Sequence, residues 1–122
     1  MTSRNDDFLT VATIMQRRRQ FLVHSFLYYV LDESFISDGQ FNDWCRELIQ
    51  LQADHPDLCA DLPYHELTKN LNTDFSAEAM GIGKSDYPLP IVSAALFTLH
   101  QHKKSKTAFK NFAEKYGYGL ES

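Results

Sequence analysis

The sequence predicts an all-α fold of four or five helices. Apolar residues recur at spacings of three and four along several segments, and residues 6–30 contain neither Gly nor Pro. No segment shows the apolar–polar alternation that marks a half-buried strand. The 122 residues and the hydrophobic fraction of 43% suit one helical domain, residues 1–122, with a modest core.

The first predicted element is a long helix over residues 6–30. Its apolar positions recur at helical spacing and comprise Phe8, Val11, Ala12, Met15, Leu22, Phe26 and Tyr29. The C-terminal half, "FLVHSFLYYV", is apolar on nearly every side. We therefore expect other elements to cover this half of the helix on more than one side.

A second helix is predicted to begin after a capping box, Ser37-Asp38-Gly39-Gln40, in which Ser37 is the N-cap. An apolar stripe follows at Phe41, Trp44, Cys45, Leu48 and Leu51. The dipeptide His55-Pro56 should end it, because Pro disfavours helix at the preceding residue. The two helices should pack as an antiparallel pair, with Trp44 mostly buried near Phe26 or Leu22.

Residues 59–122 are expected to add two or three further helices. Pro63 should begin a short one, Pro90 opens the apolar run "PIVSAALFTLHQHKK", and Ser105 begins a last one that Gly117 ends. Between them, "NTDFSAEAMGIGKSDYPLP" has the composition of a loop. These helices could form the covering layer for the first two, cover a ligand site on them, or form a homodimer face.

Charge and composition narrow the class of protein. A net charge of −4 and a pI near 5.6 argue against direct nucleic-acid binding, since such domains usually carry a basic face. Two cysteines, Cys45 and Cys59, make no disulfide framework, and Cys45 should be a buried apolar position. No apolar run is long enough for a bilayer, and the N-terminus lacks a signal-peptide core. We therefore expect a cytoplasmic protein without membrane contact.

Motifs that bear catalytic or metal chemistry are weak. "GIGKS", residues 81–85, lacks the first glycine of a phosphate-binding loop, since Glu78 stands there, and is interpreted as a flexible turn. His100 and His102 point to different helix faces, so we expect surface histidines and no metal site. The sequence contains no nucleophile elbow, and we expect no catalytic residues.

The most informative stretch is "YYVLDESFISDGQFNDWCRELIQLQADHPDL", residues 28–58. It resembles the N-terminal Ia domain of bacterial NAD-dependent DNA ligases, a helical hairpin with the pattern Y-x-Y-[YH]-V-x-D-x-P-x-I-x-D-x-x-Y-D-x-L-x-R-E-L followed by L-E-x-x-H-P-E-L. The residues in register, without a gap, are Tyr28, Tyr29, Val30, Asp32, Ile36, Asp38, Arg46, Glu47, Leu48, Leu51, His55, Pro56 and Leu58. The likeness covers about residues 17–58, so residues 1–58 are interpreted as an Ia-like hairpin and 59–122 as additional helices.

The resemblance implies a ligand site. In that family the Ia domain folds over the nicotinamide mononucleotide (NMN) half of NAD during self-adenylation. Tyr28 matches the stacking tyrosine, Tyr29 a His or Tyr beside the ligand, and Asp38 the acid of the turn. Phe41 falls on a second stacking Tyr and Asn42 on an Asp. Aromatic faces can sandwich a cationic ring, and carboxylate or amide oxygens can hold ribose hydroxyls.

Departures from the pattern limit what the resemblance implies. Phe41 lacks a hydroxyl, Asn42 lacks a charge, and Ser34 replaces the Pro of the turn. The adenylation motif K-x-D-G is absent, because Ile36 stands where its lysine would precede Asp38-Gly39. We also expect no nucleotidyltransferase domain, because 122 residues are too few for one beside the helices. We therefore expect a non-catalytic, stand-alone module that requires no cofactor, is not an enzyme, and binds NMN or the NMN half of NAD.

Two alternatives stay open from the sequence. The same fold could serve a protein–protein interaction or inhibitor role with a protein partner and without nucleotide binding. A phage or mobile element could encode such a protein. An enzyme acting on a nicotinamide nucleotide is a weaker alternative. On either view Tyr28, Tyr29 and Phe41 could simply pack within the hairpin, and Asp38 could only support the helix cap.

Overall fold

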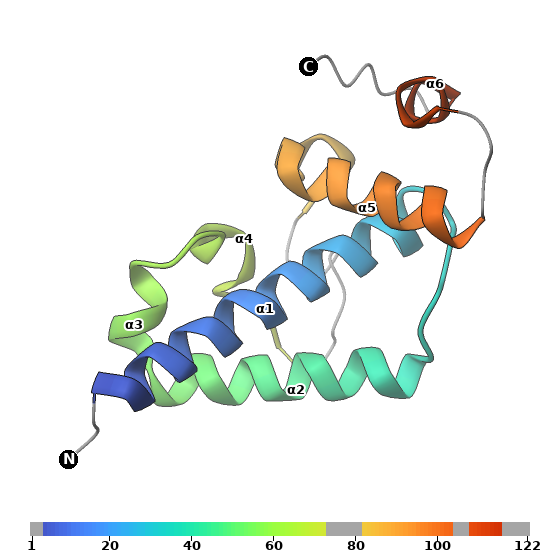
Figure 1. The fold of residues 1–122 in the computed structure, drawn as a ribbon. Coiled ribbons are helices and arrows are strands. Elements are labelled where there is room, and N and C mark those ends of the chain that lie inside the picture. Colours follow the sequence, from blue (N-terminus) through green and yellow to red (C-terminus); the bar gives the residue numbers. More distant parts are fainter. Residues whose placement is uncertain (1–3, 73–81, 104–107, 116–122) are drawn as a thin grey trace.

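The structure, a computed structural model, describes residues 4–72, 82–103 and 108–115. Within these residues it contains α-helices and one 3-10 turn, and no strand (Figure 1). The elements are α1 (Arg4–Tyr29), α2 (Asp38–Asp54), α3 (Pro56–Ala60), α4 (His65–Thr68), η1 (Lys84–Asp86), α5 (Leu89–His102) and α6 (Phe109–Lys115). The all-α prediction is confirmed.

Helix α1 lies at the centre of the fold, between α2 on one side and α5 on the other (Figure 1). In its C-terminal half Phe21, Leu22, Phe26 and Leu27 are almost completely buried, as the apolar run of that half predicts. The buried residues of α5 that face it are Ile91, Val92, Ala95, Leu96 and Leu99. The second half of the chain therefore supplies a layer over the hairpin, which two helices alone could not bury.

The buried face of α1 differs from the predicted one in its N-terminal half. Phe8 is 60% exposed and Met15 is 42% exposed, and Tyr29 at the end of the helix is also exposed. The position that turns inward beside Met15 is Ile14, followed one turn later by Arg18. The apolar pattern pointed to a different stripe because it included neither Ile14 nor the buried Arg18.

Arg18 is completely buried and joins α1 to the α3–α4 region. Burial lowers the pKa of its guanidinium, and no carboxylate is among the groups that it contacts in the described structure. Its guanidinium donates to the Gln52 side chain (2.9 Å), to the carbonyls of Pro63 (3.0 Å), Cys59 (3.2 Å) and Leu62 (3.3 Å), and approaches His65 Nδ1 (3.3 Å). Carbonyl oxygens at turns thus replace a counter-ion.

The N-terminus of α2 forms as the capping box predicts. Ser37 has extended backbone angles, and its hydroxyl accepts a hydrogen bond from the backbone N–H of Gln40 at 3.0 Å. Helix α2 ends at Asp54 with His55 as its C-cap, also as predicted. Pro56 then opens the short helix α3, which the sequence analysis did not foresee.

Replacing Ser37 by Ala is expected to lower the free energy of unfolding by about 1 kcal/mol, because the Gln40 N–H loses its acceptor. Ser37→Asp keeps a side-chain acceptor at the N-cap and should stay within a few tenths of a kcal/mol of wild type. Urea denaturation of the three proteins measures both differences. Equal stability of Ser37→Ala and wild type would contradict the assigned cap.

Trp44 is partly buried against α1, as predicted, but it lies beside His24 and Arg17 and is not among the residues packed against the core that holds Phe26 and Leu22. Its ring lies 5.5 Å from that of His24, and the Arg17 guanidinium carbon lies 5.7 Å from the ring centre. The fully buried residues of α2 are Cys45 and Leu48, both members of the predicted stripe, whereas Phe41, Trp44 and Leu51 are only partly buried. Tyr87 packs edge-on against Phe26 instead, at 5.2 Å between ring centres.

The predictions for the helices after α3 are confirmed in part. Helix α5 carries Pro90 in its first turn as predicted, and α4 follows Pro63 after Tyr64, which has a positive φ of 67°. Ser105 and Gly117, the expected limits of the last helix, lie outside the described residues, as does Gly81 of "GIGKS". His102 is exposed as predicted, but His100 is half-buried beside Phe109 and Phe112.

Candidate functional site

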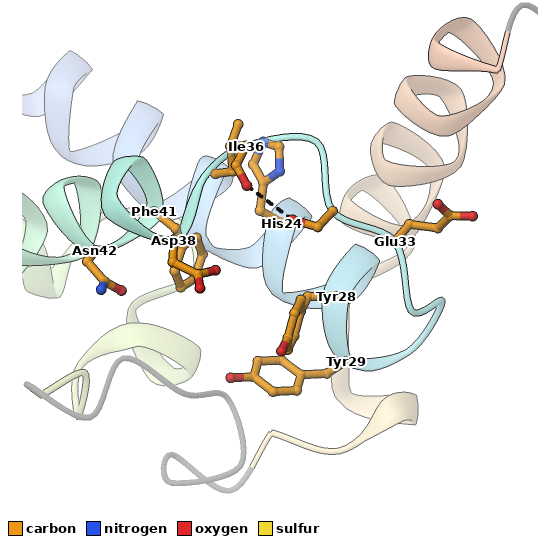
Figure 2. A pocket seen from close by; sticks show the side chains of 9 residues that line it. His24, Tyr28, Tyr29, Glu33, Ile36, Asp38, Phe41 and Asn42 are labelled. Atoms are coloured by element: carbon orange, nitrogen blue, oxygen red, sulfur yellow. Dashed lines mark hydrogen bonds between the residues drawn. The ribbon is translucent and has the colours of Figure 1, made fainter.

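A cavity of about 260 Å³ lies where α1 ends and α2 begins (Figure 2). It includes every residue that the sequence analysis selected for ligand binding. Its lining consists of His24, Tyr28, Tyr29, Glu33, Ser34, Ile36, Asp38, Phe41 and Asn42. The hairpin therefore brings the five selected side chains, from two helices, to one place.

The α1 wall is made by two adjacent tyrosines. Tyr28 is 53% exposed and Tyr29 48% exposed, and their rings meet edge to face at 4.8 Å. They are the last two residues of α1, beyond the part of the helix whose side chains are fully buried. Exposed aromatic faces of this size are available to stack on a flat ligand.

The α2 wall is made by the first turns of that helix. Figure 2 shows Asp38, Phe41 and Asn42 across the cavity from Tyr28 and Tyr29. The Phe41 ring is held by stacking on Phe21, with ring centres 5.8 Å apart, and Asp38 is exposed. Because Ser37 fixes where α2 begins, it also fixes which residues of the first turns face the cavity.

The loop between the helices closes the third side. Asp32 has a positive φ of 56°, and the next residue, Glu33, donates its N–H to the carbonyl of Leu27 at 2.8 Å. The Ser34 hydroxyl donates to the Ile36 carbonyl at 3.1 Å, shown as a dashed line in Figure 2. These bonds turn the chain back over the end of α1 and place Ser34 and Ile36 in the lining.

Sequence reasoning missed four lining residues: His24, Glu33, Ser34 and Ile36. Helical spacing could have found His24, which lies one turn before Tyr28 on the same face. The three loop residues carry no periodic signal, and only the path of the loop brings them to the cavity.

The described lining is negative. It includes two carboxylates, Asp38 and Glu33, and contains neither Lys nor Arg. Glu33 is paired with Lys103 at 3.1 Å, whereas Asp38 has no cation within ion-pair distance among the described residues. Burial lowers the pKa of His24, which keeps this ring neutral at pH 7. The cavity therefore suits a ligand that presents a positive, flat group.

The lowered pKa of His24 predicts a loss of stability in acid. The unfolded chain takes up a proton at His24 as the pH falls below 6.5, whereas the folded protein resists it, so the free energy of unfolding should fall from pH 7 to pH 5. His24→Gln should flatten this part of the dependence. Urea midpoints at both pH values measure it, and equal slopes for the two proteins would contradict the assignment.

The geometry defines a class: a helical hairpin with a cavity at its mouth that is lined by acidic and aromatic residues. The chain belongs to the family described as "DNA ligase-like, N-terminal NAD+-binding domain", whose model matches residues 10–72. That match confirms the resemblance to the ligase Ia domain. It also reaches beyond the hairpin motif, through α3 and α4.

The curated relatives are DNA ligases. Those of Roseiflexus castenholzii and Roseiflexus sp. are 45% and 44% identical over 58 and 54 residues, which are 48% and 44% of this chain. The ligase of Pseudomonas paraeruginosa is 32% identical over 81 residues, 66% of this chain. The matches span only 7% to 9% of these ligases. No solved structure matches the chain.

The described residues, 4–72, 82–103 and 108–115, give no evidence of a metal site, a membrane span or a reactive cysteine. No group of three His, Cys, Asp or Glu side chains there could hold a metal ion, and no helix there is long and apolar enough to cross a membrane. Cys45 and Cys59 are both buried free thiols, and burial raises the pKa of Cys45 to about 12. Cys45 is thus an inert core residue, as its place in the apolar stripe predicts.

Proposed function

We propose that the protein binds a nicotinamide nucleotide, NMN or the NMN half of NAD, in the cavity between α1 and α2. The observation that carries the proposal is that Tyr28, Tyr29, Asp38, Phe41 and Asn42 all line this one cavity. These are the positions that match the ligand-binding residues of the ligase domain, and they come from both helices of the hairpin. Membership of an NAD+-binding domain family supports the same ligand.

The chemistry of the walls fits each part of that ligand. The nicotinamide ring is flat and cationic, so it gains from the tyrosine faces and from the ring of Phe41. Asp38 supplies the negative charge that attracts the ring. The Asn42 amide and the tyrosine hydroxyls can hydrogen-bond the ribose hydroxyls.

The size of the cavity favours one half of NAD. Its volume of about 260 Å³ lies just below the range of about 300–1,000 Å³ that is usual for small-molecule pockets. A mononucleotide with one ring and one sugar suits such a space. The adenylate half of NAD would extend outside it.

The proposed role is binding without catalysis. Among the described residues, the lining holds no lysine that could accept an adenylate, and the family match covers residues 10–72 only. On this proposal the activity of the full-length ligases is not a property of this chain.

A charge substitution tests the proposal. Asn42→Asp restores the carboxylate of the family pattern beside the cationic ring, so it should tighten NMN binding several-fold at low salt and less at high salt. Calorimetric titration measures both affinities. Asn111→Asp, an exposed change of the same charge on α6, is the matched control and should leave the affinity unchanged.

A failure of both proteins to bind the nucleotide would contradict the proposal. If neither wild type nor Asn42→Asp binds NMN or NAD at millimolar concentration, the nucleotide proposal is wrong. The hairpin would then be a scaffold for another partner, and the exposed aromatic residues at its mouth would be the first surface to test by substitution.

A further inference from the structure

Two contacts join the loop wall of the cavity to the end of α5. The Glu33 carboxylate lies 3.1 Å from the Lys103 ammonium nitrogen, and the Phe35 and His102 rings stack with centres 4.0 Å apart at 27°. Glu33 lines the cavity, and Phe35 lies between the lining residues Ser34 and Ile36. His102 and Lys103 lie outside residues 10–72, the part that matches the ligase family.

Both contacts come from a well-anchored element. Helix α5 buries Ile91, Ala95 and Leu99 against the core, and the backbone N–H of Lys103 donates to the Leu99 carbonyl at 2.9 Å. The Glu33 and Lys103 side chains are only 27% and 44% exposed, so the ion pair is partly shielded from water. The end of α5 therefore offers a fixed support to a loop that has no helical structure of its own.

The loop needs such support. It contains Asp32 in the left-handed region, a conformation that non-glycine residues adopt only when their surroundings hold them there. One of its hydrogen bonds back to α1 is donated by the Glu33 N–H, the same residue that pairs with Lys103, and another is donated by the Leu31 N–H to the Phe26 carbonyl. Loss of the pair would therefore loosen both the turn and the cavity wall.

We infer that Lys103 and His102 are positioning residues that hold the loop wall of the cavity in its binding geometry. Figure 2 shows the Glu33 side chain directed away from Asp38 and Tyr28. Glu33 thus acts through the backbone that it anchors and not as a ligand group. The inference rests on the proposed function. It means that His102 and Lys103, which lie outside the family match, preorganise the cavity for binding.

A charge swap tests the clasp formed by Glu33 and Lys103. Lys103→Glu and Glu33→Lys each place like charges together, so each should weaken NMN binding by roughly two- to fivefold. The double variant, Glu33→Lys with Lys103→Glu, restores an opposite pair and should recover most of the affinity. Lys69→Glu is the control, since it breaks a pair with Glu66 at 2.7 Å that does not line the cavity, and it should leave the affinity unchanged.

Hydrogen exchange of the Glu33 amide gives a readout that needs no ligand. Exchange should be several-fold faster in each single variant, return toward the wild-type rate in the double variant, and stay unchanged in Lys69→Glu. If wild type binds no NMN while this pattern holds, the nucleotide proposal fails and the clasp stands. If exchange at Glu33 and NMN affinity are the same in Lys103→Glu as in wild type, the clasp is wrong.

Tighter binding would overturn the inference in another way. Lys103→Met removes the cation without adding a negative charge, and the clasp predicts weaker binding for this variant. If Lys103→Met binds NMN more tightly than wild type, then Glu33 is a ligand-binding carboxylate that Lys103 draws away from the cavity, and the positioning role is wrong.

Discussion

Arg18→Met is expected to lower the free energy of unfolding by roughly 3–5 kcal/mol, because several partly buried acceptors lose one charged donor together. The methionine keeps the length of the side chain but leaves the Gln52 oxygen and the Leu62 and Pro63 carbonyls without this donor, whereas the Cys59 carbonyl keeps the Leu62 N–H. Each buried acceptor left unsatisfied costs about 1–3 kcal/mol. Urea denaturation, followed by circular dichroism, measures the difference.

Two further variants isolate the cause. Arg19→Met makes the same change at an exposed neighbour and should stay within about 0.5 kcal/mol of wild type. Arg18→Lys keeps the charge but cannot reach all the acceptors at once, so its stability should lie between the two. If Arg18→Met is as stable as Arg19→Met, the network is not a principal support of the α1–α3 packing.

Tyr28→Ala is expected to weaken NMN binding by about 1–3 kcal/mol, by analogy with the loss of one aromatic stacking partner for a base. The side chain is 53% exposed, so its removal should change the stability of the protein little. Tyr28→Phe keeps the stacking face and should bind within a few-fold of wild type. Calorimetric titration of NMN into the three proteins measures the affinities, and equal affinity of Tyr28→Ala and wild type would remove Tyr28 from the site.

The hairpin was predictable from sequence because its signals are local. The Ser37 cap, the period of α2 and the stop at His55-Pro56 each depend on residues within a few positions of one another. The cavity residues on the helices were predictable for a different reason. Tyr28, Tyr29, Asp38, Phe41 and Asn42 match a known pattern, and the antiparallel pairing of two helices brings their ends together.

What sequence reasoning missed depends on long-range contacts. The burial of Arg18 was not predicted, because nothing nearby in the chain shows that Cys59, Leu62 and Pro63 would offer carbonyls to it. The partners Glu33 and Lys103 are seventy positions apart. Trp44 was misplaced because periodicity fixes a stripe only to within about one residue, and packing against α1 decides which side of the stripe is buried.

The most direct test of the central claim is an NMR titration of the ¹⁵N-labelled protein with NMN. The account predicts saturable shifts in the amide signals of Tyr28, Tyr29, Asp38 and Asn42, with the signals of Met15 and Tyr64 unchanged. Met15 and Tyr64 line a second cavity of about 400 Å³ that contains none of the proposed binding residues. Shifts confined to that second cavity, or no shifts at millimolar NMN, would contradict the account.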